Sequence, residues 1–551
     1  MAEQEHNRTK PISSRREFLQ GSVVTGLAAA LPTIGAVDAA AQEKVTAGHL
    51  PSELDEITLA ELQAGLKSGK FTARSLTEKY LQRIAALDRD KQGPRLNSVI
   101  ELNSDAEAIA AELDREYRNK GPRSPLHGVP VLIKDNIGTA DRMKTSAGSL
   151  ALAGSTPAQD SFVARRLREA GAVILGKTNL SEWANFRSGH STSGWSGRGG
   201  LTRNPYALDR NACGSSSGSG AATSANLCAL AVGTETDGSI VCPSSSNGIV
   251  GIKPTLGLIS RSGIVPLAHS QDTAGPMART VTDAAILLGA LAGVDSSDSA
   301  TSAAAGKIQA DYTRFLDPKG LAGARIGVVR KYFGFSEAVD DLMNSSIEAM
   351  KKAGAVIVDP AEIETFGKFD DSELLVLLYE FKADINKYLA SLSGDLPART
   401  LKDLIAFNQS NKTKEMPYFG QDLFEKAEAK GDLTSKEYVD ALAKNRQLTR
   451  TEGIDATMDK FHLDALVAPT GGPAWLIDLA NGDHSTGGSS NAAAVAGYPN
   501  INVPAGFVWQ LPVGISFFGR AWSEPALIKI AYAFEQTTKA RKPPQFLPSV
   551  G

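Results

Sequence analysis

The stretch FVARRLREAGAVILGKTN, residues 162–179, decides the fold class. Apolar residues at helical spacing lead to Gly171, and the short apolar run AVIL follows it. Glycine is a common helix terminator because it adopts the left-handed conformation without a Cβ clash. The stretch SIEAMKKAGAVIVD, residues 346–359, repeats the same order. Such helix-to-strand units predict an α/β protein with a large mixed central sheet and helices on both of its faces.

The rest of the chain extends this pattern. Apolar runs predict further strands at 96–102, 129–134, 227–233, 248–254, 463–470, 501–506 and 511–519. Helical spacing is clearest at 59–87, where Ser75 is a candidate cap, at 104–120, across 360–450 and near Ile528. Because strands resume so late in the chain, we expect a single domain over 42–551, with 360–450 as a helical insertion or lobe. The low-complexity run at 295–306 is expected to be a surface loop or linker.

Composition limits the classes of function. The chain has 551 residues, of which 42% are hydrophobic and 22% charged, as in an ordinary globular protein. Its formal net charge is −3, with both signs mixed along the chain. No basic footprint for nucleic acid or an anionic membrane is therefore present. We expect a small-molecule or peptide substrate.

The three cysteines are Cys213, Cys228 and Cys242, and none lies in a zinc-type spacing. We expect neither a disulfide scaffold nor a metal cluster. A free cysteine behaves as a small buried hydrophobe, and this is the role predicted for all three.

The N-terminus carries a targeting pattern. Arg15 and Arg16 precede a short Gly/Ala-rich apolar run, and small residues follow around Ala41. This layout predicts a twin-arginine export signal over residues 1–41 and a periplasmic or secreted mature protein. The apolar run is too short to span a bilayer, so no stable membrane insertion is expected after the signal is removed.

The run GSSSGSG, residues 214–220, allows several interpretations. A flexible linker is disfavoured because core-like elements flank it closely. A phosphate-binding loop lacks the required Gly-Lys-Ser/Thr ending. A nucleophile elbow centred on Ser216 stays open as a Ser-His-Asp esterase or lipase-like mechanism, although no strand is expected just before it. Its candidate bases are His269, His462 and His484.

Three separated motifs favour another chemistry. They are Lys134 in GVPVLIKDNI, Ser215 in CGSSSGSG, and Ser239 in GTETDGSI. Together with GKTNLSEWANF, GIKPT and SQDTAGPMA, they resemble the amidase signature family of serine hydrolases, most densely over 134–276. The resemblance implies the amidase-signature fold and a Ser-Ser-Lys triad. Its variants GTETDGSI, SAGSLAL and VAGYPN look most like bacterial peptide amidases.

The roles implied by the resemblance agree with elementary chemistry. Ser239 would be the nucleophile, and Ser215, held in a cis peptide, would pass its proton to Lys134. A lysine acts as a base only when it is neutral, which burial favours. The backbone N–H groups of Thr236, Asp237, Gly238 and Ser239 would stabilise the oxyanion. The loop bordering the acyl pocket would bring substrate against Ala184, Asn185, Phe186 and Trp195. No cofactor and no metal are implied.

The sequence departs from the family pattern at several places. Cys213 and Ser217 stand where many members have glycine, Asp237 is often glycine, and Val241 replaces a frequent arginine. Lys177 and Lys253 are rival candidates for the base. Two other functions also remain open, one as a catalytically silent binding protein and one as a glutaminase-type subunit of an amidotransferase. The favoured interpretation is an amidase that hydrolyses a carboxamide, with a peptide C-terminal amide as the implied substrate class.

Overall fold

The computed structural model describes residues 52–550. These residues belong to one compact unit. The export signal predicted over 1–41 lies outside the described residues. Within 52–550, no helix is both long enough and apolar enough to cross a membrane.

An 11-stranded mixed sheet forms the centre of the unit, as predicted. It contains both parallel and antiparallel strand pairs. In spatial order the strands are β1 (Val99–Leu102), β3 (Val173–Thr178), β2 (Pro130–Lys134), β6 (Leu230–Glu235), β8 (Thr273–Ala278), β7 (Val250–Lys253), β12 (Asn500–Val508), β13 (Leu511–Phe518), β11 (Ala465–Pro469), β9 (Arg325–Val328) and β10 (Val356–Val358). A separate ribbon pairs β4 (Trp195–Ser196) with β5 (Gly200–Leu201).

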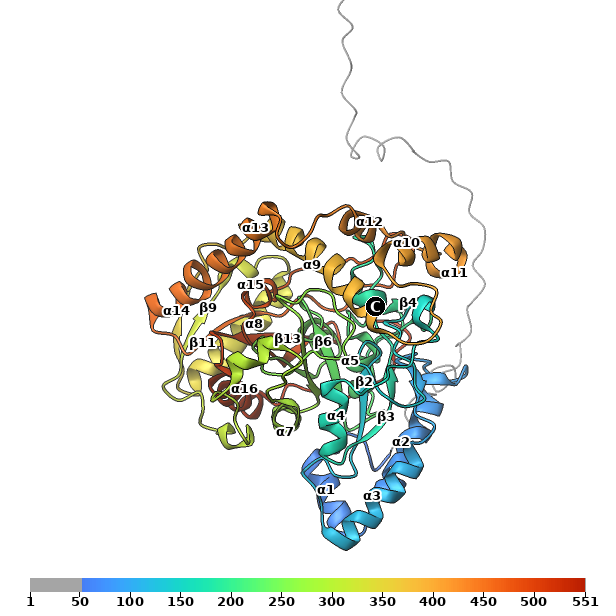
Figure 1. Cartoon of the computed structure of the whole chain (residues 1–551). Helices are drawn as coiled ribbons and strands as arrows, with labels where there is room; N and C mark the ends of the chain where they lie inside the picture. The colour runs from blue at the N-terminus through green and yellow to red at the C-terminus, as the bar shows by residue number, and fades with distance from the viewer. Residues whose placement is uncertain (1–51, 551) are drawn as a thin grey trace, which may run out of the picture. The chain divides into compact units, whose positions relative to one another are not determined.

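Helices cover both faces of the sheet (Figure 1). On one face α4, α7, α16 and α8 contact one another in series, and α5 and α6 pack against the strands elsewhere. The helices are α1 (Leu59–Ser68), α2 (Ala73–Arg83), α3 (Ala106–Lys120), α4 (Phe162–Glu169), α5 (Ser217–Ser224), α6 (Val241–Ser246), α7 (Val281–Leu291), α8 (Glu337–Lys352), α9 (Asp370–Ser391), α10 (Leu401–Ser410), α11 (Lys412–Glu415), α12 (Asp422–Glu428), α13 (Lys436–Arg446), α14 (Asp455–Phe461), α15 (Asn491–Ala496) and α16 (Glu524–Thr538).

The helical lobe predicted over 360–450 is present as α9 to α13, drawn in orange along the upper edge of Figure 1. Aromatic residues join it to the signature core. Phe381 of α9 packs on Phe186, with ring centroids 5.1 Å apart. Phe424 of α12 meets Trp183 edge-on at 5.8 Å. The lobe therefore covers the loop that follows β3.

One local expectation was wrong. The cap of α2 is Thr72, whose hydroxyl accepts from the backbone N–H of Ser75, while the Ser75 hydroxyl accepts from the backbone N–H of Thr72. Ser75 is thus the third residue of a capping box.

The run at 295–306 is a surface segment, as predicted, and it includes a short 3-10 helix over Ser299–Ala304. Side chains order it, because Asp298 accepts hydrogen bonds from Arg261 and Asp295 accepts from Ser260.

The topology brings two strand ends together. β2 and β6 are parallel neighbours in which Ile133 lies opposite Val232. Since parallel strands end at the same edge of a sheet, Lys134 at the end of β2 lies beside Thr234 of β6. A crevice outside the carboxyl ends of such strands is a usual place for a ligand.

Candidate active site

Lys134 is fully buried and its ammonium nitrogen faces hydroxyl groups. Nζ lies 2.7 Å from Ser215 Oγ, 2.9 Å from Thr234 Oγ1 and 3.2 Å from the Thr234 carbonyl oxygen. Asn136 donates to the same Thr234 hydroxyl at 2.9 Å, which fixes its orientation. No carboxylate within residues 52–550 forms an ion pair with Lys134.

Burial lowers the pKa of Lys134 to about 7. Removal from water disfavours the charged amine, and the more distant carboxylates of Asp272 and Glu235 only partly oppose this effect. A substantial fraction of Lys134 is therefore neutral near pH 7. A neutral amine 2.7 Å from a hydroxyl can accept its proton.

The run GSSSGSG is rigidly packed and is not a spacer. The peptide bond between Gly214 and Ser215 is cis, as the family resemblance implies. A Cβ on Gly214 would lie 2.2 Å from Ser181 Oγ, and one on Gly218 would lie 2.2 Å from the Ser98 carbonyl oxygen. The second half of the run, from Ser217, forms the first turns of α5. Glycine is required here by close packing.

The geometry gives no support to a nucleophile elbow at Ser216. The Ser216 hydroxyl is buried, donates to the Thr234 carbonyl at 3.0 Å and accepts from the Thr234 N–H at 3.2 Å. Among the candidate bases, His269 binds Asp384 and His484 binds Asp478. In the part of the chain that the structure describes, no histidine contacts Ser216.

Ser239 ends a sharp turn that Glu235 stabilises. Glu235 Oε2 accepts from the backbone N–H groups of Ile240 at 2.7 Å and Val241 at 3.0 Å, just after Ser239. Gly238 has a φ of +77°, which strongly favours glycine. Within residues 52–550 the structure gives no hydrogen bond from the N–H groups of residues 236–239. These donors are left available to a ligand.

The Ser215 loop and the Ser239 turn are in direct contact. The backbone N–H of Ser216 donates to the carbonyl oxygen of Ser239 at 3.2 Å. A disulfide joins Cys213 to Cys242, with the two Cα atoms 6.0 Å apart. The prediction of three free cysteines was therefore wrong for two of them. Cys228 is free and buried, as predicted.

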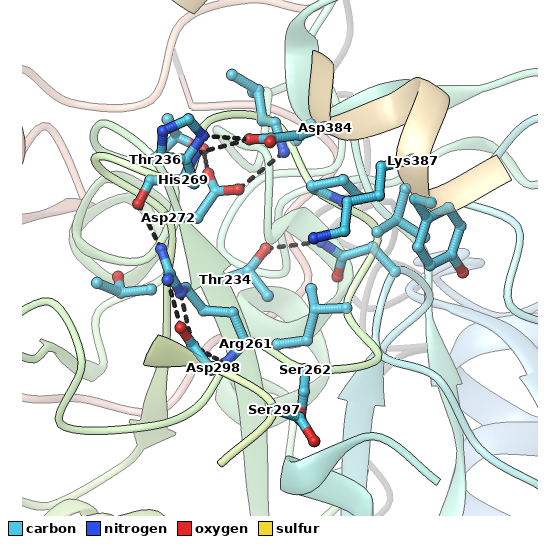
Figure 2. A pocket seen from close by; sticks show the side chains of 18 of the residues that line it. Thr234, Thr236, Arg261, Ser262, His269, Asp272, Ser297, Asp298, Asp384 and Lys387 are labelled. Atoms are coloured by element: carbon cyan, nitrogen blue, oxygen red, sulfur yellow. Dashed lines mark hydrogen bonds and ion pairs between the residues drawn. The ribbon is translucent and has the colours of Figure 1, made fainter. Parts of the chain in front are cut away.

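Two cavities flank the turn at 236–238. The first has a volume of about 300 Å³ and reaches Asn136, Thr234 and Thr236 (Figure 2). The second has a volume of about 240 Å³ and is bordered by Gly214, Gly238 and the Cys213–Cys242 disulfide. The turn at 236–238 thus lies between the two cavities.

The first cavity has its charges largely paired, as Figure 2 shows. Arg261 is held by Asp298, and His269 by Asp384. Asp272 accepts from the Thr236 hydroxyl at 2.6 Å, and burial raises its pKa to about 6. Asp272 therefore fixes the start of the turn at 236–238.

The predicted substrate-binding residues divide into two groups. Ala184 borders the first cavity and Asn185 the second. Phe186 is 6% exposed and packs on Phe381, and Trp195 is 6% exposed and meets Phe419 edge-on at 5.2 Å. Phe186 and Trp195 border neither of these two cavities, because residues of the lobe pack against both rings.

The helical lobe also reaches the turn. Gln271 donates through Nε2 to the Thr236 carbonyl oxygen at 3.3 Å and to Glu373 of α9 at 3.0 Å. Burial raises the pKa of the Glu373 carboxyl well above its ordinary value, and the nearby Asp237 carboxyl adds to the effect. One side chain therefore links the lobe to the edge of the site.

Sequence reasoning missed Thr234 and Glu235, although both lie in the motif that contains Ser239. Thr234 supplies two of the oxygen atoms around Lys134, and Glu235 caps the turn. The available signal was position, because both residues lie in the motif GTETDGSI between the predicted strand at 227–233 and Ser239.

Comparison with known proteins places the chain in a family. An amidase family model matches residues 75–528. A probable amidase from Arabidopsis thaliana is 43% identical over 503 residues, which are 90% of this chain and 92% of that protein. A glutamyl-tRNA(Gln) amidotransferase chain from Thermoanaerobacter pseudethanolicus is 33% identical, and the match covers 90% of this chain and 99% of that one.

A solved structure of similar sequence and fold is also an amidase. The peptide amidase from Stenotrophomonas maltophilia is 53% identical, with a TM-score of 0.85 over 90% of this chain and 99% of that one. The family match and the shared fold confirm the predicted family. The chain belongs to the amidase family and is an enzyme that hydrolyses carbon–nitrogen bonds.

Proposed function

We propose that this protein hydrolyses a carboxamide to a carboxylate and ammonia through Ser239, Ser215 and Lys134. The observation that carries the proposal is the buried, hydroxyl-facing Lys134, with its pKa of about 7 and its Nζ 2.7 Å from Ser215 Oγ. A serine hydroxyl is a weak nucleophile until a base removes its proton.

The reaction begins with a proton relay. Ser239 Oγ attacks the amide carbonyl carbon, its proton passes to Ser215 Oγ, and the Ser215 proton passes to neutral Lys134. The reverse path protonates the leaving nitrogen, so that the C–N bond breaks and ammonia departs. Water then attacks the acyl group on Ser239 by the same relay and releases the carboxylate.

We assign stabilisation of the oxyanion to the backbone N–H groups of the turn at 236–239. Its N–H groups have no acceptor within residues 52–550, and Gly238 permits the sharp backbone path. A donor aimed at a developing oxyanion lowers the barrier by roughly 3 kcal/mol. Glu235 and Asp272 hold this turn from its two ends.

A peptide C-terminal amide is the proposed substrate class. The support is the 53% identity to the Stenotrophomonas maltophilia peptide amidase and the presence of cavities on both sides of the turn. Ammonia is a small leaving group, so the larger cavity of about 300 Å³ is available to the peptide side. Export to the periplasm or medium, proposed from Arg15 and Arg16, would expose the enzyme to such peptides.

Substitution of the nucleophile tests this mechanism. Ser239→Ala should abolish release of ammonia from an N-acylated dipeptide amide, and it should also abolish labelling by a fluorophosphonate. Ser215→Ala should be severely impaired. Thr457→Ala removes a buried hydroxyl that bonds only to the Glu362 and Gly453 carbonyls, away from both cavities, and controls for a general effect of serine or threonine removal. Full turnover by Ser239→Ala would refute the proposal, and loss on Ser216→Ala with a histidine variant would support the elbow mechanism instead.

A glutaminase-type component of an amidotransferase is the second candidate. The 33% identity to the glutamyl-tRNA(Gln) amidotransferase chain favours it. Glutamine hydrolysis that requires added partner proteins would establish this function. Hydrolysis of peptide amides by the isolated chain would exclude it.

A further inference from the structure

We infer that the Cys213–Cys242 disulfide is a positioning crosslink of the active site, so that amide hydrolysis is fast in the oxidised protein and slow in the reduced one. The inference rests on the proposed function, because it concerns the same Ser215 and Ser239. It adds a redox dependence and two positioning residues to that function.

The disulfide joins the two segments that carry the proposed relay. Cys213 directly precedes the Gly214–Ser215 peptide, and Cys242 lies three positions after Ser239, in the first turn of α6. The 29-residue separation along the chain is reduced to 6.0 Å between Cα atoms. A change in this distance changes the distance between the Ser215 loop and the Ser239 turn.

Short-range hydrogen bonds hold the backbone of Cys213 itself. The Cys213 N–H donates to Asn211 Oδ1 at 2.8 Å, and its carbonyl oxygen accepts from Ser217 Oγ at 2.5 Å. Both partners lie within four residues of Cys213. The direct backbone link from the loop to the nucleophile turn is the 3.2 Å bond from Ser216 to Ser239. A side-chain bridge adds to it, because Asn247 Nδ2 donates to the Ala212 carbonyl oxygen at 2.9 Å and to the Pro243 carbonyl oxygen at 2.7 Å. The disulfide is the covalent link beside these two hydrogen-bonded ones.

The disulfide is accessible from the second cavity. Both sulfur-bearing residues border that 240 Å³ space, together with Gly214 and Gly238. Cys213 is 5% exposed, whereas Cys242 is partly exposed, so a thiolate entering the cavity meets Cys242 first. Cys228 is fully buried and does not border the cavity. A small reductant can therefore distinguish the disulfide from the free thiol.

The exchange is an ordinary two-electron reaction. The thiolate of a dithiol such as dithiothreitol attacks Cys242 Sγ, the S–S bond breaks, and Cys213 leaves as a thiolate. The second dithiol sulfur then attacks the mixed disulfide and releases Cys242. Two electrons and two protons pass to the protein, which gains two thiols, and the dithiol becomes a cyclic disulfide. A disulfide of this kind persists in the oxidising compartments to which the proposed signal directs the chain.

Kinetics of the oxidised and reduced enzyme test the inference. Dithiothreitol treatment should lower kcat for a dipeptide amide by roughly 10–100-fold at 20 °C, since a misplacement of about 1 Å can cost 10²-fold. The rate of Ser239 labelling by a small fluorophosphonate should fall equally, because it needs the relay and not the cavity. Oxidised glutathione should restore both rates, and Cys228→Ser should behave as the wild type throughout.

Substitutions separate positioning from stabilisation. Cys213→Ser, Cys242→Ser and the double variant should show the same loss, since each opens the same bond, and none should respond to dithiothreitol. Tryptophan fluorescence and circular dichroism at 20 °C should show that the reduced protein stays folded.

Two results would overturn the inference. The first is unchanged kcat and labelling rate in the reduced protein and in the double variant, with only a lower Tm. The second is loss of activity that merely follows unfolding. Either result leaves the proposed function intact if Ser239→Ala is inactive. An active Ser239→Ala variant would instead refute the proposed function.

Discussion

Two buried lysines on adjacent strands show what distinguishes a base from a structural cation. Lys134 ends β2, and Lys177 lies on β3, where it is paired with Ile133. Since neighbours in register share a face of the sheet, Lys134 and Lys177 point to opposite faces. Both are fully buried, and burial lowers the pKa of Lys134 to about 7 and that of Lys177 to about 8.

Their partners differ more than their burial. Lys134 faces two hydroxyls and one carbonyl. Lys177 donates to the Ile137 carbonyl oxygen and to Thr145 Oγ1, and the nearby Asp135 carboxylate favours its charged form. Each lysine contacts a hydroxyl, which can exchange a proton with an amine. Only the hydroxyl at Lys134, that of Ser215, belongs to a loop that contacts the Ser239 turn. Burial lowers the pKa of both lysines, but only Lys134 lies beside the proposed nucleophile loop.

Activity should separate the two lysines most strongly. Lys134→Met should lower kcat/KM for a peptide amide by roughly 10²–10⁴-fold, the usual contribution of a positioned base. Lys177→Met should retain the wild-type kcat/KM per folded molecule. Steady-state kinetics on variants of equal circular dichroism would measure this. Equal losses in both variants would show that the comparison does not identify the base.

The pH profile should report Lys134. Only the neutral amine accepts a proton, and its fraction falls tenfold per pH unit below a pKa of about 7. We therefore expect kcat/KM to rise with pH through about 7 and to level off above it. Lys177→Met should keep this profile. An optimum near pH 5 would contradict a lysine base.

We expect Lys177→Met, which keeps its activity, to lose more folding stability than Lys134→Met. Lys177→Met leaves the Ile137 carbonyl without its charged donor, which should lower the free energy of unfolding by about 1–3 kcal/mol. Lys134→Met leaves Thr234 with its hydrogen bonds from Asn136 and Ser216. Urea unfolding at pH 7 should therefore find Lys134→Met at least as stable as the wild type. A greater loss in Lys134→Met would break the contrast.

The last contrast concerns the pH dependence of that stability. The pKa of Lys134 is about 7 when folded and near the ordinary 10.5 when unfolded, so between these values the unfolded chain binds more protons. The wild type should therefore gain stability relative to Lys134→Met as the pH rises from 7 toward 10. Urea midpoints at both pH values would measure the change, and parallel curves for the two proteins would argue against the depressed pKa.

Local patterns predicted much of the fold. The units at 162–179 and 346–359 became α4 with β3 and α8 with β10, because helix periodicity and glycine stops depend on near neighbours. The motif residues Lys134 and Ser215 were predicted from family resemblance, and the structure brings them within 2.7 Å. Residues that meet at strand ends can thus be predicted from sequence when they lie in distinctive motifs.

The unpredicted features mostly depend on contacts between distant segments. The disulfide needs the approach of two turns that are 29 residues apart, which spacing alone does not reveal. Phe186 and Trp195 were expected at the substrate because they lie on a loop, but Phe381 and Phe419 of the lobe cover them. The cap of α2 is an exception that depends only on near neighbours. Thr72 and Ser75 both carry hydroxyls that can cap a helix, so the sequence does not tell which one is the N-cap.

The Gln271 bridge has a consequence for the divergence of related enzymes. The amide nitrogen of this side chain donates both to Glu373 in the lobe and to the carbonyl oxygen of Thr236. A lobe exchanged for that of a relative would bring its own residue at position 373 and leave Gln271 behind. Evolutionary replacement or engineered grafting of the lobe should therefore succeed most often when both positions are inherited together.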